Sequence, residues 1–348
     1  MKHARNLVIA GLAAISLAAC GGAGSGDSTR SSIRAVGSST VYPFAKLVSE
    51  EFARNNSQFS SPIIESTGTG GGIQLFCSGV GADTPDIANA SRRMKASEFA
   101  TCQQNGVNEV TEIQVGLDGI VFASKQGGID LALTPKIVYE ALAANPYGGE
   151  QTNETWSDVD PSLPDLPILV YGPPSTSGTR DALKELILEA GCTTNPEMEA
   201  LKESDEDRYD QICTETRADQ KFVEQGEQDN LIVQKIEGNE NAVGVFGYSY
   251  LEENLDRVQG LSMNGVEPTF ENISSFQYPG ARPLFIYVKN AHLGAIPGLR
   301  EFIAAWTQSW GKDGSLSKIG LVPNAADQME RNVLAASDFP ALTANDLN

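Results

Sequence analysis

The sequence contains very little histidine. Only His3 and His292 occur among 348 residues, and we expect His292, in the segment 289–298, to lie on the surface. A Ser-His-Asp or Cys-His mechanism needs an imidazole as its general base. Zinc sites draw mainly on histidine and cysteine, and the sequence has no C-x-x-C motif. The shortage of histidine therefore argues against a hydrolase of these kinds and against a metal site.

Sequence motifs of other common enzymes are also missing. There is no G-x-S-x-G elbow, no phosphate-binding G-x-x-x-x-G-K-[ST] loop and no G-x-G-x-x-G fingerprint. The sequence consequently predicts a binding protein without a cofactor, and not an enzyme.

Basic residues are scarce relative to acidic ones. The chain has 25 Lys and Arg residues against 45 Asp and Glu residues, which gives a net charge of −20. Nucleic acid is therefore excluded as a partner, because its phosphates would be repelled. An anionic ligand remains compatible with this charge, because surface charges are screened over about 8–10 Å and a buried ligand depends on local donors.

Only one long apolar run is present, and it lies at the N-terminus. Lys2 and Arg5 precede the run 7–19, which ends in a Leu-Ala-Ala-Cys sequence that resembles a bacterial lipobox. We expect residues 1–20 to be a lipoprotein signal peptide, Cys20 to carry the lipid, and residues 21–32 to form a flexible tether. Ordinary signal cleavage near an A-x-A site is the alternative. Either reading predicts an exported protein of the periplasm or cell envelope, and no other run is long and apolar enough to span a bilayer.

Four of the five cysteines remain once Cys20 is assigned to the lipid. An even number in an oxidising compartment predicts two disulfides. The pairs that are local in sequence are Cys77–Cys102 and Cys192–Cys213.

Strand and helix patterns alternate along the chain. Predicted strands cover 31–39, 62–68, 166–172 and 282–289, and 85–93 is predicted as a strand followed by a charged turn. Predicted helices cover 41–55, 72–80, 95–106 and 133–144. We expect residues 67–72 to be a glycine-rich loop, 107–125 to be paired strands, and the acidic segment 196–220 to be a solvated helical face. The alternation predicts an α/β fold with mainly parallel sheets.

Four junctions between a strand and a helix or turn share one composition. Each places small hydroxyl residues, glycine or arginine where a strand ends, at 37–43, 66–72, 88–93 and 174–180. Backbone N–H groups at a helix start bind anions, and glycine permits a close approach. A single junction of this kind is an ordinary helix cap. Four of them favour a shared anion site.

The order of these motifs is similar to that of a known family. GSSTVYPF, STGTGGG, DIANASR and STSGTRDA, followed by GVFGYSY and RPLFIYV, resemble the periplasmic phosphate-binding proteins of ABC transporters over about residues 33–325. The resemblance implies two α/β domains, hinge strands, an interdomain ligand cleft and delivery of inorganic phosphate to a membrane ABC permease. We expect a monomer with domain one at 33–115 and 284–345 and domain two at 116–283.

The resemblance also implies a set of ligand-binding residues. The positions that match the family's phosphate loops are Ser39, Thr40, Thr69, Ser177, Gly178 and Thr179. Two positions depart from the pattern. Ser91 followed by Arg92 stands where the family has an aspartate, and Pro173 stands where it has an arginine, with Arg180 directly after the Ser-Gly-Thr triplet.

These departures leave two questions open. The family's aspartate accepts the proton of monohydrogen phosphate, and either Ser91 or Asp118 is available for that role here. We expect Arg92 and Arg180 to supply charge-assisted hydrogen bonds to the anion, the alternative being that both are solvated surface residues. Without the aspartate, a receptor for sulfate or molybdate is the second interpretation, and a secreted phosphohydrolase is a third.

Overall fold

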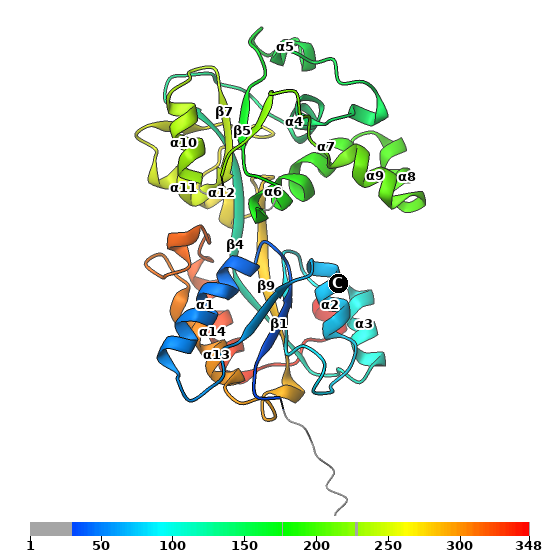
Figure 1. Cartoon of the computed structure of the whole chain (residues 1–348), viewed down its shortest axis with the longest axis vertical. Helices are drawn as coiled ribbons and strands as arrows, with labels where there is room; N and C mark the ends of the chain where they lie inside the picture. Colours follow the sequence, from blue (N-terminus) through cyan, green and yellow to red (C-terminus); the bar gives the residue numbers. More distant parts are fainter. Residues whose placement is uncertain (1–29, 176, 227–228, 348) are drawn as a thin grey trace, which may run out of the picture.

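Two long strands connect the two halves of the molecule. β4 spans Val110–Lys125 and β9 spans Ala281–Lys289, and they pair antiparallel over most of their length. The computed structural model describes residues 30–175, 177–226 and 229–347. Figure 1 shows both strands running from a lower lobe into an upper lobe, with helices around each.

The lower lobe is built on one end of this sheet. Its strands follow the order β2-β1-β3-β9-β4, with β1 at Arg34–Gly37, β2 at Ile63–Ser66 and β3 at Ile87–Ala90. Its helices are α1 (Tyr42–Asn55), α2 (Thr69–Phe76), α3 (Ala96–Gln104), α13 (Leu299–Ser309) and α14 (Ala326–Asp338), with short 3-10 turns at Asn290–His292, Ser317–Ile319 and Ala344–Leu347.

The upper lobe continues the sheet in the order β4-β7-β5-β6, with β8 also paired to β4. Its strands are β5 (Val170–Gly172), β6 (Phe222–Glu224), β7 (Val243–Gly247) and β8 (Val258–Gly260). Its helices are α4 (Pro135–Leu142), α5 (Trp156–Val159), α6 (Gly178–Ala182), α7 (Glu189–Cys192), α8 (Pro196–Ser204), α9 (Glu206–Cys213), α10 (Asp229–Glu237), α11 (Tyr248–Glu253) and α12 (Phe270–Ser274), with a 3-10 turn at Pro146–Gly148 and a π-helical stretch at Leu183–Leu188 between α6 and α7.

Several local sequence signals predicted their elements well. α1 carries Pro43 in its first turn, and α4 begins after Thr134, whose side chain accepts from the Ile137 N–H at 3.1 Å. A fixed proline φ and a threonine cap both stabilise a helix start. Trp156 and Tyr139 fill the core of the upper lobe, and Trp306 that of the lower lobe.

The prediction of paired strands over 107–125 is wrong, because this segment is one strand of 16 residues. It pairs with β9 up to Gly119 and with β7 from Ile120 onward. A register shift between Gln114 and Gly116 interrupts the first pairing, and such bulges bend a strand without ending it. The sheet is also mixed, not mainly parallel, since β4 and β9 run antiparallel to their neighbours.

The predicted glycine-rich loop at 67–72 is helical from Thr69 onward. Gly72 serves packing, because a Cβ there would lie 2.3 Å from the Cα of Gly37. Only a residue without a side chain lets α2 approach β1 this closely.

Two disulfides link neighbouring helices. They join Cys77 to Cys102 and Cys192 to Cys213, at sequence separations of 25 and 21. These are the two sequence-local pairs named above. The second one encloses the acidic helices α8 and α9, and closing a loop of this size contributes roughly 3 kcal/mol on the chain-entropy model.

Cys20 and the predicted signal peptide lie outside the described residues. Among those that are described, no helix has the length and apolar character needed to cross a membrane.

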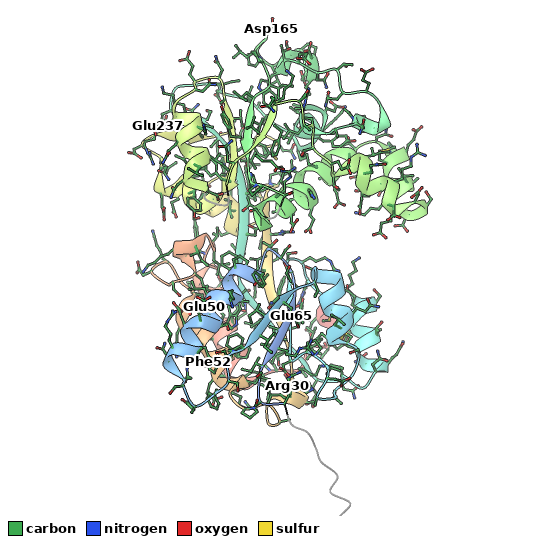
Figure 2. All side chains as sticks on the ribbon, viewed as in Figure 1. Arg30, Glu50, Phe52, Glu65, Asp165 and Glu237 are labelled. Atoms are coloured by element: carbon green, nitrogen blue, oxygen red, sulfur yellow. A yellow bond between two sulfur atoms is a disulfide. The ribbon has the colours of Figure 1, made fainter. Side chains whose placement is uncertain are left out.

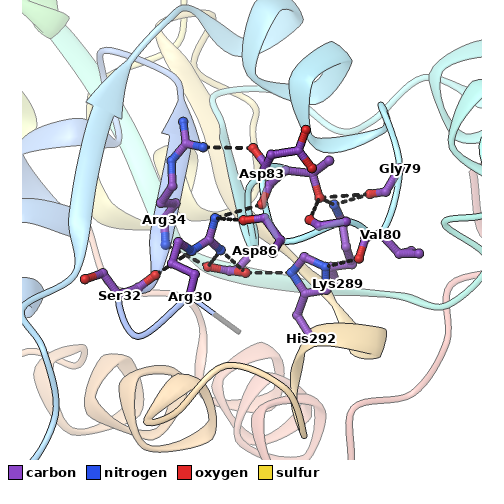
Figure 3. Close-up of polar contacts among 12 residues, drawn as sticks. Arg30, Ser32, Arg34, Gly79, Val80, Asp83, Asp86, Lys289 and His292 are labelled. Carbon is purple, nitrogen blue, oxygen red and sulfur yellow. Dashed lines mark hydrogen bonds and ion pairs between the residues drawn. The ribbon is translucent and has the colours of Figure 1, made fainter. Parts of the chain in front are cut away.

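A buried ion cluster lies at the end of the lower lobe remote from the upper lobe (Figures 2 and 3). Asp86 is fully buried and accepts from Arg30 Nη2 at 2.6 Å on both oxygens. It also contacts His292 Nδ1 at 2.6 Å and accepts from the Arg34 N–H at 2.7 Å. The expectation of a surface histidine is wrong, because His292 is 3% exposed. Its carboxylate partner is 206 residues away in sequence.

Lys289, at the end of β9, is buried in the same region. Its ammonium donates to Thr84 Oγ1 at 2.8 Å and to the Gly79 carbonyl at 2.5 Å. Burial lowers its pKa to about 8, although Asp86 opposes the shift. Arg30 donates further to the carbonyls of Ala82 and Thr84. The cluster therefore fixes Arg30 to the segment 82–86.

We predict that Asp86→Asn lowers the free energy of unfolding by about 3–5 kcal/mol, because it removes the counter-charge of Arg30 and of the nearby buried Lys289. Denaturant titration followed by circular dichroism measures this. Asp83→Asn is the matched control, since Asp83 is exposed, and it should change stability by less than about 0.5 kcal/mol. Equal, small losses for the two variants would contradict a structural role for the cluster.

Candidate functional site

Two of the predicted loops meet between the lobes. The loop after β1 carries Ser39 and Thr40, and the loop after β5 leads into α6, which Figure 1 shows on the side of the upper lobe that faces the lower lobe. The Ser39 hydroxyl donates to the Asp181 carboxylate, and the Thr40 hydroxyl donates to the Gly178 carbonyl at 3.5 Å. The hydroxyl residues of both lobes thus lie next to each other.

Glycine is required at position 178 for this approach. A Cβ there would lie 2.9 Å from the Thr40 Cα, which is too close for a real side chain. Ser177 caps the helix start by accepting from the Thr179 N–H at 3.2 Å. On the opposite loop, Ser38 accepts from the Tyr42 N–H through its carbonyl at 3.0 Å.

Arg282 is the cation at the centre of this arrangement. It lies near the start of β9, opposite Asp118 of β4, and its side chain is 7% exposed. Its Nη2 donates to Thr40 Oγ1 at 2.8 Å, its Nε donates to Asp118 Oδ2 at 3.2 Å, and its Nη1 donates to Glu185. One buried guanidinium therefore joins both hinge strands to the loop of one lobe and the helix of the other.

Sequence reasoning missed Arg282, since it treated 282–289 only as a buried return strand. The available signal was a charged residue at the start of an otherwise apolar run. A buried guanidinium needs partners that satisfy its five donors. An arginine in a strand predicted to be buried therefore indicates polar partners nearby.

Asp118 is the fixed carboxylate of the site. Its side chain is 14% exposed. Burial raises its pKa, the positive charge of Arg282 opposes that rise, and Glu185 adds to it. This carboxyl therefore holds a proton more readily than an exposed aspartate does.

Two cavities lie near Arg282, which lines the larger of them and contacts Thr40 and Asp118 in the lining of the smaller one. The inner cavity, of about 190 Å³, is lined by residues of both lobes: Thr40, Pro43, Phe44, Asp118, Ser177, Gly178, Thr179, Asp229, Gly247, Tyr250, Ile319 and Gly320. The outer cavity, of about 530 Å³, is lined by Thr69, Gly70, Ser91, Arg92, Arg93, Lys95, Glu185, Leu186, Glu189, Lys202, Arg282 and Pro283. Of the predicted site residues, Thr40, Ser177, Gly178 and Thr179 line the inner cavity, Thr69, Ser91 and Arg92 line the outer one, and Ser39 and Arg180 line neither.

The group at the outer cavity includes Thr69 and Ser91. Their hydroxyls lie 3.0 Å apart, and Thr69 Oγ1 accepts from the Ser91 N–H at 3.1 Å. The loops after β2 and β3 are joined by these bonds.

Arg92 also lines the outer cavity, but its guanidinium pairs with Glu98 at 2.8 and 3.0 Å. This hydrogen bond raises the pKa of Arg92, and desolvation acts in the opposite direction. Arg93 pairs with a different acid, Glu112, at 2.6 Å. The two adjacent arginines, which follow the end of β3 at Ala90, therefore have separate acidic partners.

Arg180 lines neither of these cavities. It is 4% exposed, so the alternative of a solvated surface residue is wrong. Its Nη1 donates to the Pro173 carbonyl and to Glu224 Oε1, each at 3.0 Å, and its guanidinium lies 4.5 Å from the centre of the Phe222 ring. Arg180 thus holds the loop before the Ser-Gly-Thr triplet to β6.

The charge balance around Arg282 is acidic. Asp118 and Glu185 contact the guanidinium directly, and Asp181 lies on the same helical segment as Glu185. No group of three or more His, Cys, Asp or Glu side chains suited to a metal ion was found within residues 30–175, 177–226 and 229–347. The site therefore consists of hydroxyl groups and one cation, Arg282, whose charge is balanced by nearby carboxylates.

Comparison with known proteins places this arrangement in a family. The PBP superfamily domain model matches residues 23–309. Protein SphX of Synechococcus elongatus is 33% identical over 304 residues, which cover 84% of this chain and 78% of SphX. Phosphate-binding protein PstS of Staphylococcus epidermidis is 30% identical over 312 residues, which cover 86% of this chain and 83% of that protein.

A solved structure has the same fold. The crystal structure of a possible phosphate binding protein from Planctomyces limnophilus superposes with a TM-score of 0.71 at 26% identity, and covers 88% of this chain and 98% of that one. The predicted fold class, two α/β domains joined by hinge strands, is confirmed. The chain therefore belongs to the PBP superfamily, in the family that includes SphX and the phosphate-binding protein PstS.

Proposed function

We propose that this protein binds inorganic phosphate between its two lobes and delivers it to a membrane ABC permease. The observation that carries the proposal is the buried guanidinium of Arg282, which donates to Thr40 beside the Ser-Gly-Thr loop at 177–179. A cation surrounded by hydroxyl and amide donors matches the charge and the many acceptor oxygens of phosphate. The printed names of the relatives, phosphate-binding protein PstS among them, support the same ligand.

In this proposal both lobes hold the anion. Ser39 and Thr40 of one lobe, and Ser177, Gly178 and Thr179 of the other, provide hydroxyl and amide donors. Arg282 provides the positive charge that the sequence led us to expect from Arg92 and Arg180. Domain closure around the ligand would then follow from the fact that neither lobe carries the whole donor set.

Asp118 is the proposed acceptor for the proton of monohydrogen phosphate. Ser91, the other candidate, is bonded to Thr69 and faces the outer cavity. A carboxylate beside the anion repels fully ionised sulfate but accepts a hydrogen bond from a protonated phosphate oxygen. Asp118 thus supports phosphate over sulfate or molybdate, which remain the alternative ligands.

The remaining predicted site residues are proposed to assist binding. Thr69, Ser91 and Arg92 line the outer cavity together with Arg282. Arg180 supports the loop that carries Ser177 by holding the Pro173 carbonyl.

We propose that the protein acts as an exported lipoprotein and monomer, not as an enzyme. Its domains are proposed to comprise 33–115 with 284–345, and 116–283. Lipid attachment at Cys20 would place the anchor ten residues before Arg30, which the ion cluster fixes to the end of the lower lobe remote from the upper lobe (Figure 2). Ten residues span at most about 35 Å, so that end would face the membrane.

Isothermal titration calorimetry of the purified protein with phosphate and with sulfate tests the ligand. We predict micromolar or tighter phosphate binding, about −8 kcal/mol or more favourable, and weaker sulfate binding because of Asp118. A clear sulfate isotherm without any phosphate heat would overturn the assignment in favour of a sulfate receptor.

We predict that Arg282→Ala weakens phosphate binding at least tenfold, since charge-assisted hydrogen bonds contribute roughly 1.5–3 kcal/mol each and about 1.4 kcal/mol is a factor of ten. Arg93→Ala is the control, because Arg93 is exposed and pairs with Glu112, and it should bind like the parent. If Arg282→Ala bound normally while Arg92→Ala lost binding, the anion would belong in the outer cavity instead.

A further inference from the structure

The donors of the proposed anion site are hydrogen-bonded to carboxylates of the protein itself. The Ser39 hydroxyl donates to Asp181, and Arg282 Nη1 donates to Glu185. A phosphate bound by Ser39 and Arg282 would need these same two donors. The two carboxylates and the anion therefore compete for them.

Asp181 and Glu185 act from one helical segment. They are four residues apart on the helix that begins at Gly178, and residues at this spacing lie on the same face. Asp181 accepts from Ser39 in the loop after β1, and Glu185 accepts from Arg282 in the hinge strand β9. One face of this upper-lobe helix therefore occupies donors on both the loop and the strand.

The carboxylates at the site differ in how easily they can leave. The Glu185 side chain is 51% exposed, so it can turn into water at a small desolvation cost. Asp181 is partly exposed as well. Asp118, 14% exposed and bonded to the Nε of Arg282, is enclosed by comparison. An incoming anion can therefore replace Asp181 and Glu185 at their donors, whereas Asp118 stays bonded to Arg282.

We propose that Asp181 and Glu185 are internal competitors that set the affinity and the selectivity of the anion site. This inference rests on the proposed function, since it concerns the same donors. A monocarboxylate from solution has the same acceptor group as Asp181 or Glu185, so exchanging one for the other gains no hydrogen bond. A tetrahedral dianion has enough acceptor oxygens to accept from Ser39, Thr40 and Arg282 together, and by doing so would displace both internal carboxylates at once.

The Ser39–Asp181 bond has a second consequence, because it joins the two lobes directly. Removing the Asp181 carboxylate takes away an interlobe contact whether or not an anion is bound. We therefore expect the phosphate-free protein to sample more open arrangements when Asp181 is replaced.

The test compares Asp181→Ala, the isosteric Asp181→Asn and Glu185→Gln with the parent protein. We expect each to bind inorganic phosphate about three- to tenfold more tightly by calorimetry, and acetate to compete with phosphate in Asp181→Ala but not in the parent. Asp181→Asn guards against a loss of helix stability in the alanine variant. Glu203→Gln, which removes one exposed negative charge on α8, is the control for net charge and should bind like the parent.

Small-angle X-ray scattering of the phosphate-free proteins gives the second readout. Asp181→Ala should show a larger radius of gyration than the parent, and Glu203→Gln should not. Unchanged or weaker phosphate binding by both Asp181 variants would overturn the competitor role. If the parent binds no phosphate, the proposed ligand is wrong, and the scattering comparison still decides whether Asp181 holds the lobes together.

Discussion

The arrangement between the lobes depends on one buried guanidinium. Arg282 donates to Thr40, and the Thr40 hydroxyl donates in turn to the Gly178 carbonyl. This chain of hydrogen bonds runs from the hinge through one lobe to the other. Because an unpaired buried cation is costly, the carboxylates Asp118 and Glu185 also gather around it. The same requirement makes the site acidic, so an incoming anion must exchange with groups that already satisfy the guanidinium.

Local features of the sequence were sufficient for the α/β class and for several helix starts. Periodicity, proline in the first turn of α1 and the Thr134 cap are short-range signals, and they predicted helices and strand ends correctly. The predicted loops at 39–40 and 177–179 come together because the segments after β1 and β5 contact each other between the lobes. The resemblance to a family supplied the two-domain arrangement, which local patterns alone do not specify.

The sequence did not reveal which distant residues pair with each other in the fold. Arg92 and Arg180 were assigned to the anion, but Glu98 and Glu224 satisfy them within the fold. An arginine's need for acceptors can be inferred from sequence, whereas the identity of the acceptors depends on tertiary packing. The single long β4 was missed for the same reason, because its continuity comes from switching partners between β9 and β7.

The position of the anion is the central claim, and anomalous diffraction from crystals grown with arsenate, a tetrahedral analogue of phosphate, tests it directly. The account predicts one strong arsenic peak where Arg282 meets Thr40 at the edge of the inner cavity, with arsenate oxygens about 2.7–3.2 Å from donors of both residues. It also predicts that Glu185 no longer accepts from Arg282. A peak in the outer cavity beside Arg92 and Ser91, with Arg282 still bonded to Glu185, would contradict the account.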